Sequence, residues 1–449
     1  MELLVKVYLV TEKLIQQFRN AVYQSFLKRP DAVVDLIDAL TVASHVSSPV
    51  ALSEETPFRR KFSMVYDTLA QAVIDFDALL HTLLTFRPAE CETIAGYEVY
   101  ALDATKDERP DAETLSERVS LKSQKDEPLV YGHKYSWLVR LVAWGTSWAA
   151  PQDVIRIDPE LTDSQVGGQQ VKELAERHSN PKVVVEDSLY GNHLFLGVFL
   201  LIQNTFALVR MRITNVLYEQ PEPHPPGKRG APKKHGAKFK LSSPSRSADC
   251  EEAFQLGSQT IRLKAWKNLH LKKLPKLVVM MLKVEFLKAD GTLRYKQPMW
   301  LLWSGPTDVP LQELCQMYLW RFAIEHMFRF LKQNLGLNSS RSNDLVATEQ
   351  WMWLCALAYW QLLLMRDLVE ADRPAWYPGF REGKARQLSP GLVQRAALRF
   401  LVKLGTPAQA PRVVGKGKGR QTGYHPTPRT RYPVIKKGKT GQKQVIADP

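Results

Sequence analysis

The sequence has few cysteines and lacks the patterns of a secretory signal or a membrane-spanning segment. It contains only four cysteines in 449 residues, none in a CxxC or other zinc-ligand spacing. We interpret them as buried or incidental thiols of a reducing compartment. The N-terminal 18 residues carry scattered glutamates and lysines, which a secretory signal would not. The most apolar run, residues 351–365, is too short to span a membrane and contains Gln361, so we predict a buried helix there.

Acidic residues are also in short supply. The chain has 46 Asp and Glu against 61 Lys and Arg, which gives a net charge of +15 and a pI near 9.5. A globular protein this basic usually binds a polyanion, and we expect nucleic acid. An anionic membrane surface is the weaker alternative because no basic amphipathic helix stands out. Hydrophobic residues make up 45% of the chain, so it can bury a large core.

The character of the sequence changes several times along the chain. Helical periodicity gives way to mixed strand and helix patterns, which are typical of an α/β domain. A loop rich in Pro, Gly, Lys and Arg then interrupts the α/β pattern and is followed by strand-like runs. We therefore predict five regions: helices over 1–95, the first part of an α/β domain over 96–211, a β-rich insertion over 212–298, the second part of the α/β domain over 299–370, and a C-terminal region over 371–449.

The C-terminal region ends in a basic tail. Residues 412–443 contain ten Lys or Arg and no Asp or Glu. We expect this tail to be disordered and to add salt-dependent, sequence-neutral affinity for phosphates.

A helix predicted over about 310–335 carries polar side chains of four kinds on one side. At about 100° per residue, its Tyr, Arg, Glu and Lys fall within an arc of roughly 60°, and apolar residues fill the opposite face. An ordinary amphipathic helix with an Arg–Glu pair would explain two of these charges. Phosphoryl chemistry would explain all four, because a carboxylate binds a divalent ion while Arg, Lys and Tyr bind phosphate. The residues are Tyr318, Arg321, Glu325 and Lys332.

Two acids, Asp103 and Asp187, each end a strand-like apolar run. A single acid at a strand end is more often a turn or helix cap. Two divalent ions about 4 Å apart, however, need several oxygen ligands, and these two aspartates are the natural partners of Glu325. The metal-site hypothesis depends on this combination of three carboxylates.

With these motifs the sequence resembles the bacterial insertion-sequence transposases of the YREK signature, a branch of the DDE recombinases with an RNase H-like catalytic fold. The segments Tyr-Ala-Leu-Asp103-Ala-Thr and Glu-Asp187-Ser-Leu-Tyr-Gly-Asn are similar to those around the two aspartates of that family. The YREK residues match at full spacing. The resemblance covers roughly residues 97–365, and a β-rich insertion between the second aspartate and the glutamate is also what this family shows.

The resemblance implies that Asp103, Asp187 and Glu325 hold two Mg²⁺ (or Mn²⁺) ions. These ions would activate water to cut DNA at the ends of the element and then activate the freed 3′-OH for strand transfer. It further implies that Tyr318, Arg321 and Lys332 bind phosphates near the cut, and that the enzyme works as a homodimer on double-stranded DNA carrying terminal inverted repeats and on target DNA. We expect a cytoplasmic, nucleoid-associated protein of a prokaryote, with no membrane partner.

The insertion offers further candidate DNA contacts. The basic loop is expected to bind the DNA backbone. Trp266 stands between cations and either packs in a small β core or stacks on a flipped base. The N-terminal helices are expected to bind the ends of the element. The loop residues in question are Lys228, Arg229, Lys233 and Lys234.

Three other functions remain open at this point. The chain could be an inactive or domesticated transposase that only binds element ends. It could be a nuclease of the same fold that cuts without strand transfer. An RNA-associated basic protein would explain the charge but not the three acids, and no RNA-binding module is apparent.

Overall fold

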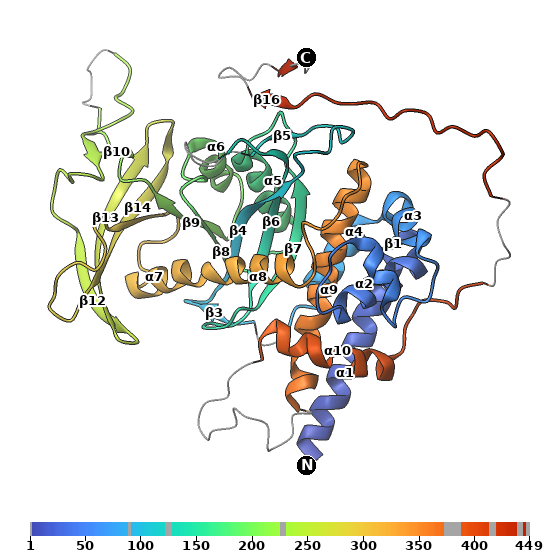
Figure 1. The fold of residues 1–449 in the computed structure, drawn as a ribbon. Coiled ribbons are helices and arrows are strands. Elements are labelled where there is room, and N and C mark those ends of the chain that lie inside the picture. Colours follow the sequence, from blue (N-terminus) through green and yellow to red (C-terminus); the bar gives the residue numbers. More distant parts are fainter. Residues whose placement is uncertain are drawn as a thin grey trace.

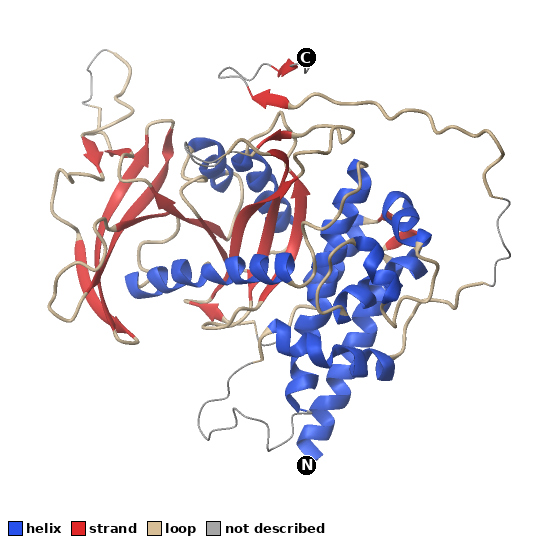
Figure 2. Ribbon diagram, in the orientation of Figure 1, coloured by secondary structure: helices blue, strands red, loops and turns tan. Residues whose placement is uncertain are grey.

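The computed structural model describes residues 2–88, 91–121, 128–224, 230–371, 388–412, 419–437 and 443–445. Its centre is a mixed sheet with helices on both faces (Figures 1 and 2). This architecture fits an RNase H-like fold.

Strand β4 (Tyr97–Glu108) lies in the middle of the sheet. It runs parallel to β8 (Lys182–Glu186) and antiparallel to β6 (Tyr131–Leu141). On the outer sides, β9 (Thr205–Met211) is parallel to β8, and β7 (Ala149–Arg156) is antiparallel to β6. All five residues of β8 are buried, as expected for a short strand rich in valine that is covered on both faces.

The strands after β9 extend this same sheet instead of forming a separate one. The chain returns through β15 (Met299–Trp303), which pairs antiparallel with both β9 and β14. Residues 212–298 therefore add their strands at the β9 side, where Figure 1 shows them curving away from the helices. These strands are β10 (Val216–Glu219), β11 (Lys238–Lys240), β12 (Cys250–Leu256), β13 (Gln259–Leu271) and β14 (Leu274–Leu287).

Alternate residues of the central strands pack on opposite helices. Val184 belongs to the same buried cluster as residues of α5 (Asp163–Arg177). Its neighbours Val183 and Val185 belong to the cluster that includes α7 (Leu311–Trp320) and α8 (Phe322–Gln333). Because side chains alternate along a strand, α5 covers one face of the sheet and α7 and α8 cover the other.

The helical residues at the two ends of the chain form one layer with α9 (Leu345–Ala371). Helix α9 is apolar enough to cross a membrane by length and composition, but the relevant part of it is 94% buried, as in a core helix. Its neighbours share one buried cluster with the strands and helices of the sheet region, so the predicted N-terminal region has no core of its own. They are α1 (Glu2–Gln24), α2 (Pro30–Val42), α3 (Ser63–Gln71) and α10 (Pro390–Leu404), with α4 (Phe76–Thr85) on the α1 side.

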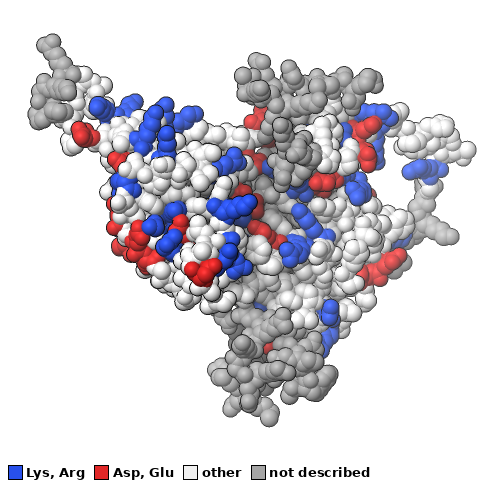
Figure 3. All heavy atoms as spheres, turned by 60° about the vertical axis from the view of Figure 1, so that its left-hand side comes forward, with Lys and Arg blue, Asp and Glu red and all other residues white. Residues whose placement is uncertain are grey.

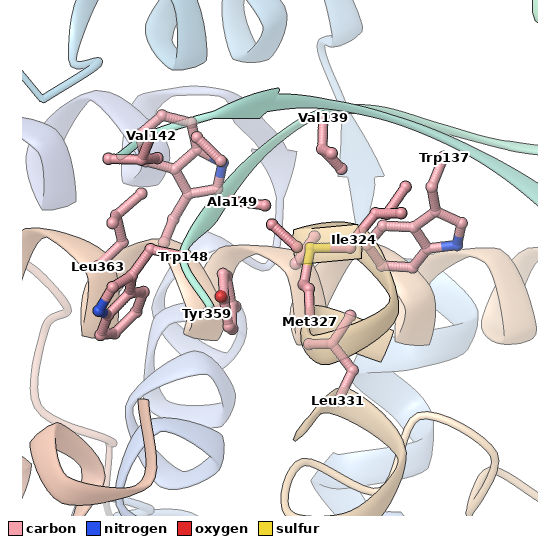
Figure 4. Close-up of a cluster of buried hydrophobic side chains, with 14 of the residues drawn as sticks. Trp137, Val139, Val142, Trp148, Ala149, Ile324, Met327, Leu331, Tyr359 and Leu363 are labelled. Atoms are coloured by element: carbon pink, nitrogen blue, oxygen red, sulfur yellow. The ribbon is translucent and has the colours of Figure 1, made fainter. Parts of the chain in front are cut away.

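The apolar side of α8 fixes the rotation of that helix. Ile324, Met327 and Leu331 lie against Trp137 and Val139 of β6 (Figure 4). All five side chains are fully buried. The polar side of α8 is thereby turned away from this core, along the edge of the sheet that carries the aspartates.

Three predictions about local structure need correction. The helix expected over 310–335 is two helices, α7 and α8, which meet at Arg321. Strand β4 does not end at Asp103 but continues to Glu108. The C-terminal region contains α10, and part of the basic tail is ordered, because β16 (Ile435–Lys437) pairs with β5 (Val119–Ser120).

Candidate active site

Asp103 lies within β4, opposite Trp137 of β6. Its side chain shares a face with Val99 and Ala101, which pack in the cluster of α7 and α8. One carboxylate oxygen accepts a hydrogen bond from the Ala104 N–H at 2.8 Å. The carboxylate therefore faces the helix that carries Glu325, although it does not stand at a strand end.

Asp187 follows the last residue of β8, as predicted. It is half-buried, and its Oδ1 accepts a hydrogen bond from the Leu189 N–H at 2.8 Å. The preceding Glu186 is fully buried, and neither of its oxygens has a hydrogen-bond partner among the described residues. Burial, followed by the nearby Asp187 charge, raises the pKa of Glu186 well above its usual range. Burial thus disfavours the charged form of Glu186, whereas the half-buried Asp187 is the acid that reaches the surface of this part of the sheet.

Arg321 connects the strand to the helix. Its Nη1 lies 3.3 Å from Oδ2 of Asp103, and its Nη2 lies 2.9 Å from Oε1 of Glu325. The junction between α7 and α8 keeps helical angles (φ −47°, ψ −30°), so Arg321 and Glu325 remain one turn apart on the same side. The geometry therefore brings Asp103 and Glu325 to one guanidinium, although they are far apart in sequence.

The electrostatics place all three carboxylates in one site. Burial raises the pKa of Asp103 to about 6, Arg321 opposes this rise, and the charges of Asp187 and Glu325 add to it. Like charges disfavour each other's ionisation only when they are close together. Asp103 therefore lies within electrostatic reach of Asp187, Glu325 and Arg321.

The chemistry of these side chains fits divalent metal ions. All three offer hard carboxylate oxygens, which Mg²⁺ and Mn²⁺ prefer. A cation would offset both the burial of Asp103 and the smaller repulsion from Asp187 and Glu325 that together raise its pKa. Among the described residues, no three His, Cys, Asp or Glu side chains lie close enough together to hold one ion as they stand. Two of the carboxylates instead contact Arg321, which occupies the position of a cation.

The other two residues of the YREK motif differ in exposure. Tyr318 is only 6% exposed. Burial raises its pKa, while Arg321 and Arg210 lower it and Asp187 raises it, so its hydroxyl lies among these three charges. Lys332 is exposed near the C-terminal end of α8. Partial burial lowers its pKa, and the nearby charges of Glu108 and Asp103 act in the opposite direction.

Arg210 is a site residue that the sequence analysis missed. It follows Val209, which pairs with Glu186 in the parallel β8–β9 ladder, so Arg210 lies beside Asp187 at the same edge of the sheet. It is exposed and makes no ion pair or hydrogen bond through its side chain within the described residues. A lone arginine at the end of an apolar strand gives no local signal, because only the register places it beside an aspartate.

The predicted contacts of the insertion have different outcomes. Lys233 and Lys234 are exposed, whereas Lys228 and Arg229 lie outside the described residues. Trp266 is 3% exposed, and its indole N–H donates to the Arg246 carbonyl. Its ring packs against Phe239 and Trp300, as in the packing alternative, and the base-stacking role stays a prediction.

Basic side chains surround a depression on the face of the molecule that Figure 3 shows. Figure 3 turns the insertion toward the viewer and shows Lys and Arg on both sides of a depression in which Asp and Glu are also visible. A carboxylate site flanked by cations suits a polyanionic substrate that meets a metal.

The comparisons with known proteins agree with this chemistry. The family model described as DDE superfamily endonuclease matches residues 21–272, which is more than half of the chain. The matched residues span the positions of Asp103 and Asp187 and end before α8. No curated protein matches the chain.

Proposed function

Because the chain belongs to the DDE superfamily endonucleases, we propose that it is a DNA transposase of the YREK-signature group. It would cleave at the ends of its mobile element and join the freed 3′-OH to target DNA. The observation that carries this proposal is the double contact of Arg321 with Asp103 and Glu325, next to Asp187.

Asp103, Asp187 and Glu325 would hold two Mg²⁺ or Mn²⁺ ions. Bound there, these ions would supply activation of a water or 3′-OH nucleophile and stabilisation of the leaving oxygen. Asp103 must be ionised to act as a ligand, and its pKa of about 6 makes it mostly so at neutral pH. Arg321 would exchange its carboxylate partners for a phosphate oxygen, to which a guanidinium binds well.

The DNA backbone would be held on both sides of the carboxylates. On one side Arg210 and the hydroxyl of Tyr318 lie next to Asp187. On the other side Lys332 is within electrostatic reach of Asp103. Lys233 and Lys234 would add backbone contacts from the insertion, outside the site.

The substrates would be double-stranded DNA with terminal inverted repeats and a target duplex. The two ends of the element must be brought together in one complex, so we propose a homodimer. We propose that it acts on the nucleoid of a prokaryote. A nuclease without strand transfer is the alternative that the family description alone would allow, and an inactive end-binding protein is the other.

The test uses the purified protein and a duplex that carries the ends of its own element, with and without Mg²⁺. Glu325→Gln is the matched variant because it keeps the shape and removes the charge. We expect wild type to cut at the element boundary only with metal, and the variant to bind without cutting. Joined products on a second duplex would separate a transposase from a nuclease. If wild type binds and cuts with no divalent ion, the proposal fails.

A further inference from the structure

The chain leaves the helical layer through a well-anchored segment after α10. The Gly405 carbonyl accepts a hydrogen bond from Arg19, and the Ala408 carbonyl accepts one from Arg59. The Gln409 carbonyl accepts one from Arg60, and its N–H donates to Asp31. Residues 405–409 are therefore fixed to the N-terminal helices.

The chain is anchored a second time on residues 113–119, next to the sheet. The Tyr432 N–H donates to the Glu113 carbonyl and the Ile435 N–H donates to the Arg118 carbonyl, both at 2.8 Å. Ile435 then pairs with Val119 in parallel. Its side chain borders a cavity of about 520 Å³ whose apolar wall includes Val119, Leu129 and Ile157.

Between these two anchors, the described residues lie on the surface. The described residues 410–412 and 419–430 are all exposed, and none of them hydrogen-bonds to another part of the chain. Figure 1 shows the red trace passing well outside the helices before it returns to β16. Pro426 and Pro428 favour an extended backbone here, so the absence of packing is built into the sequence.

The charge of this segment has one sign. The sequence from Gln409 to Lys437 contains no acid. Of its described basic side chains, Arg412, Arg420 and Arg429 are exposed without an ion pair, whereas Arg431 pairs with Glu113 at 3.1 Å. The Arg420 guanidinium lies 5.7 Å from the ring centroid of Tyr424. Exposed guanidinium groups without carboxylate partners, interleaved with an aromatic ring, are suited to a phosphate backbone.

We propose that the described residues 410–412 and 419–430 form a strap that binds duplex DNA, and that the pairing of β16 with β5 is its clasp. The clasp lies on residues 113–119, which follow β4, the strand that bears Asp103. A duplex at the carboxylates would therefore lie on the strand whose end leads into the clasp residues. The inference rests on the proposed function only in taking DNA as the substrate.

The strap differs from a free polycation in that its effect depends on the clasp. A segment held at both ends keeps its cations in a smaller volume than a segment held at one end, and so presents them at a higher effective concentration. Proline at 432 and 435 removes the two clasp N–H donors and leaves every charge in place. Thr422→Pro is the matched control because its N–H makes no hydrogen bond within the described residues and proline is favoured at the second position of a turn.

The experiment measures dissociation of full-length protein from a labelled duplex during a competitor chase, at several KCl concentrations. We compare wild type, Tyr432→Pro/Ile435→Pro, Thr422→Pro and a chain ended after Gln409. We expect the control to match wild type and the clasp variant to dissociate about tenfold faster or more. Truncation should reduce the slope of log K against log [salt] by about 3, because three or four phosphate contacts are lost.

Two results would overturn the strap. If the clasp variant stays on DNA as long as wild type while the truncated chain does not, the tail acts as a free polycation. If all four proteins dissociate alike, the segment does not touch DNA. Metal-dependent cleavage is measured in the same samples. If cleavage is intact and either of these results is found, only the strap proposal is contradicted. If the clasp variant dissociates faster but wild type does not cleave, only the transposase proposal is contradicted.

Discussion

Replacement of Arg19 by methionine tests whether the N-terminal helices belong to the catalytic body. Arg19 donates to both oxygens of Asp38, at 2.6 and 2.8 Å, and also to Oε1 of Gln361 on α9 at 2.5 Å. The side chains of Arg19 and Asp38 are only 4% and 6% exposed. Arg19→Met leaves the Asp38 carboxylate buried without its cation, which typically costs about 3–5 kcal/mol.

This loss is measured by urea unfolding. With a slope of about 3 kcal/mol per molar urea, the midpoint should fall by about 1 M or more. Arg177→Met is the control: its pair with Asp77 is exposed, at 35% and 82%, so the variant should unfold within about 0.5 kcal/mol of wild type. Arg19→Met/Asp38→Leu should recover most of the loss. A single-variant loss below about 1 kcal/mol would refute a shared core.

Three further predictions follow from buried or close-packed groups. Burial lowers the pKa of His133 to about 4, so between that value and about 6.5 the unfolded chain binds more protons than the folded one. The contribution of His133 to the free energy of unfolding is therefore complete above about pH 6.5 and falls by about 3 kcal/mol as the pH falls to 4. His133→Gln should flatten the free energy of unfolding against pH in this range. Equal profiles for variant and wild type would contradict the lowered pKa of His133. A Cβ at Gly167 would lie 2.5 Å from Cδ2 of Leu102, the neighbour of Asp103. Gly167→Ala should therefore slow cleavage about tenfold without weakening DNA binding. Unchanged cleavage would show that α5 does not support the site. Arg210→Gln should lower the salt slope of DNA binding by about 1, and a slope equal to that of wild type would mean that Arg210 contacts no phosphate.

The parts of the fold that were predictable from sequence are those fixed by local pattern. Strand β8 is a run of valines between polar residues, so both its position and the place of Asp187 after it follow from the pattern. The apolar face of α8 was also predictable, because Ile324, Met327 and Leu331 repeat at helical spacing and are buried as expected. That face alone decides which way Glu325 points.

The errors arise where distant contacts override the local pattern. Asp103 looked like the end of a strand because charged residues follow it. Strand β4 continues because those residues pair with β6, and because Arg109 beyond it is held by the carbonyl of Ser342. The break at Arg321 leaves helical periodicity intact, so no pattern could reveal it. The docking of Ile435 on Val119 joins residues more than 300 positions apart and has no local signal at all.

The central claim is that Glu325 is a metal ligand rather than only a partner of Arg321. Glu325→Cys tests it directly, because a thiolate binds Mn²⁺ better than Mg²⁺. Cleavage of the element-end duplex is measured with each ion for wild type, Glu325→Cys and Glu325→Gln. The account predicts that Glu325→Cys is inactive with Mg²⁺ and regains cleavage with Mn²⁺, while Glu325→Gln stays inactive with both. The account would be contradicted if Glu325→Cys cleaved equally well with Mg²⁺ and with Mn²⁺. It would also be contradicted if Glu325→Gln cleaved as well as wild type.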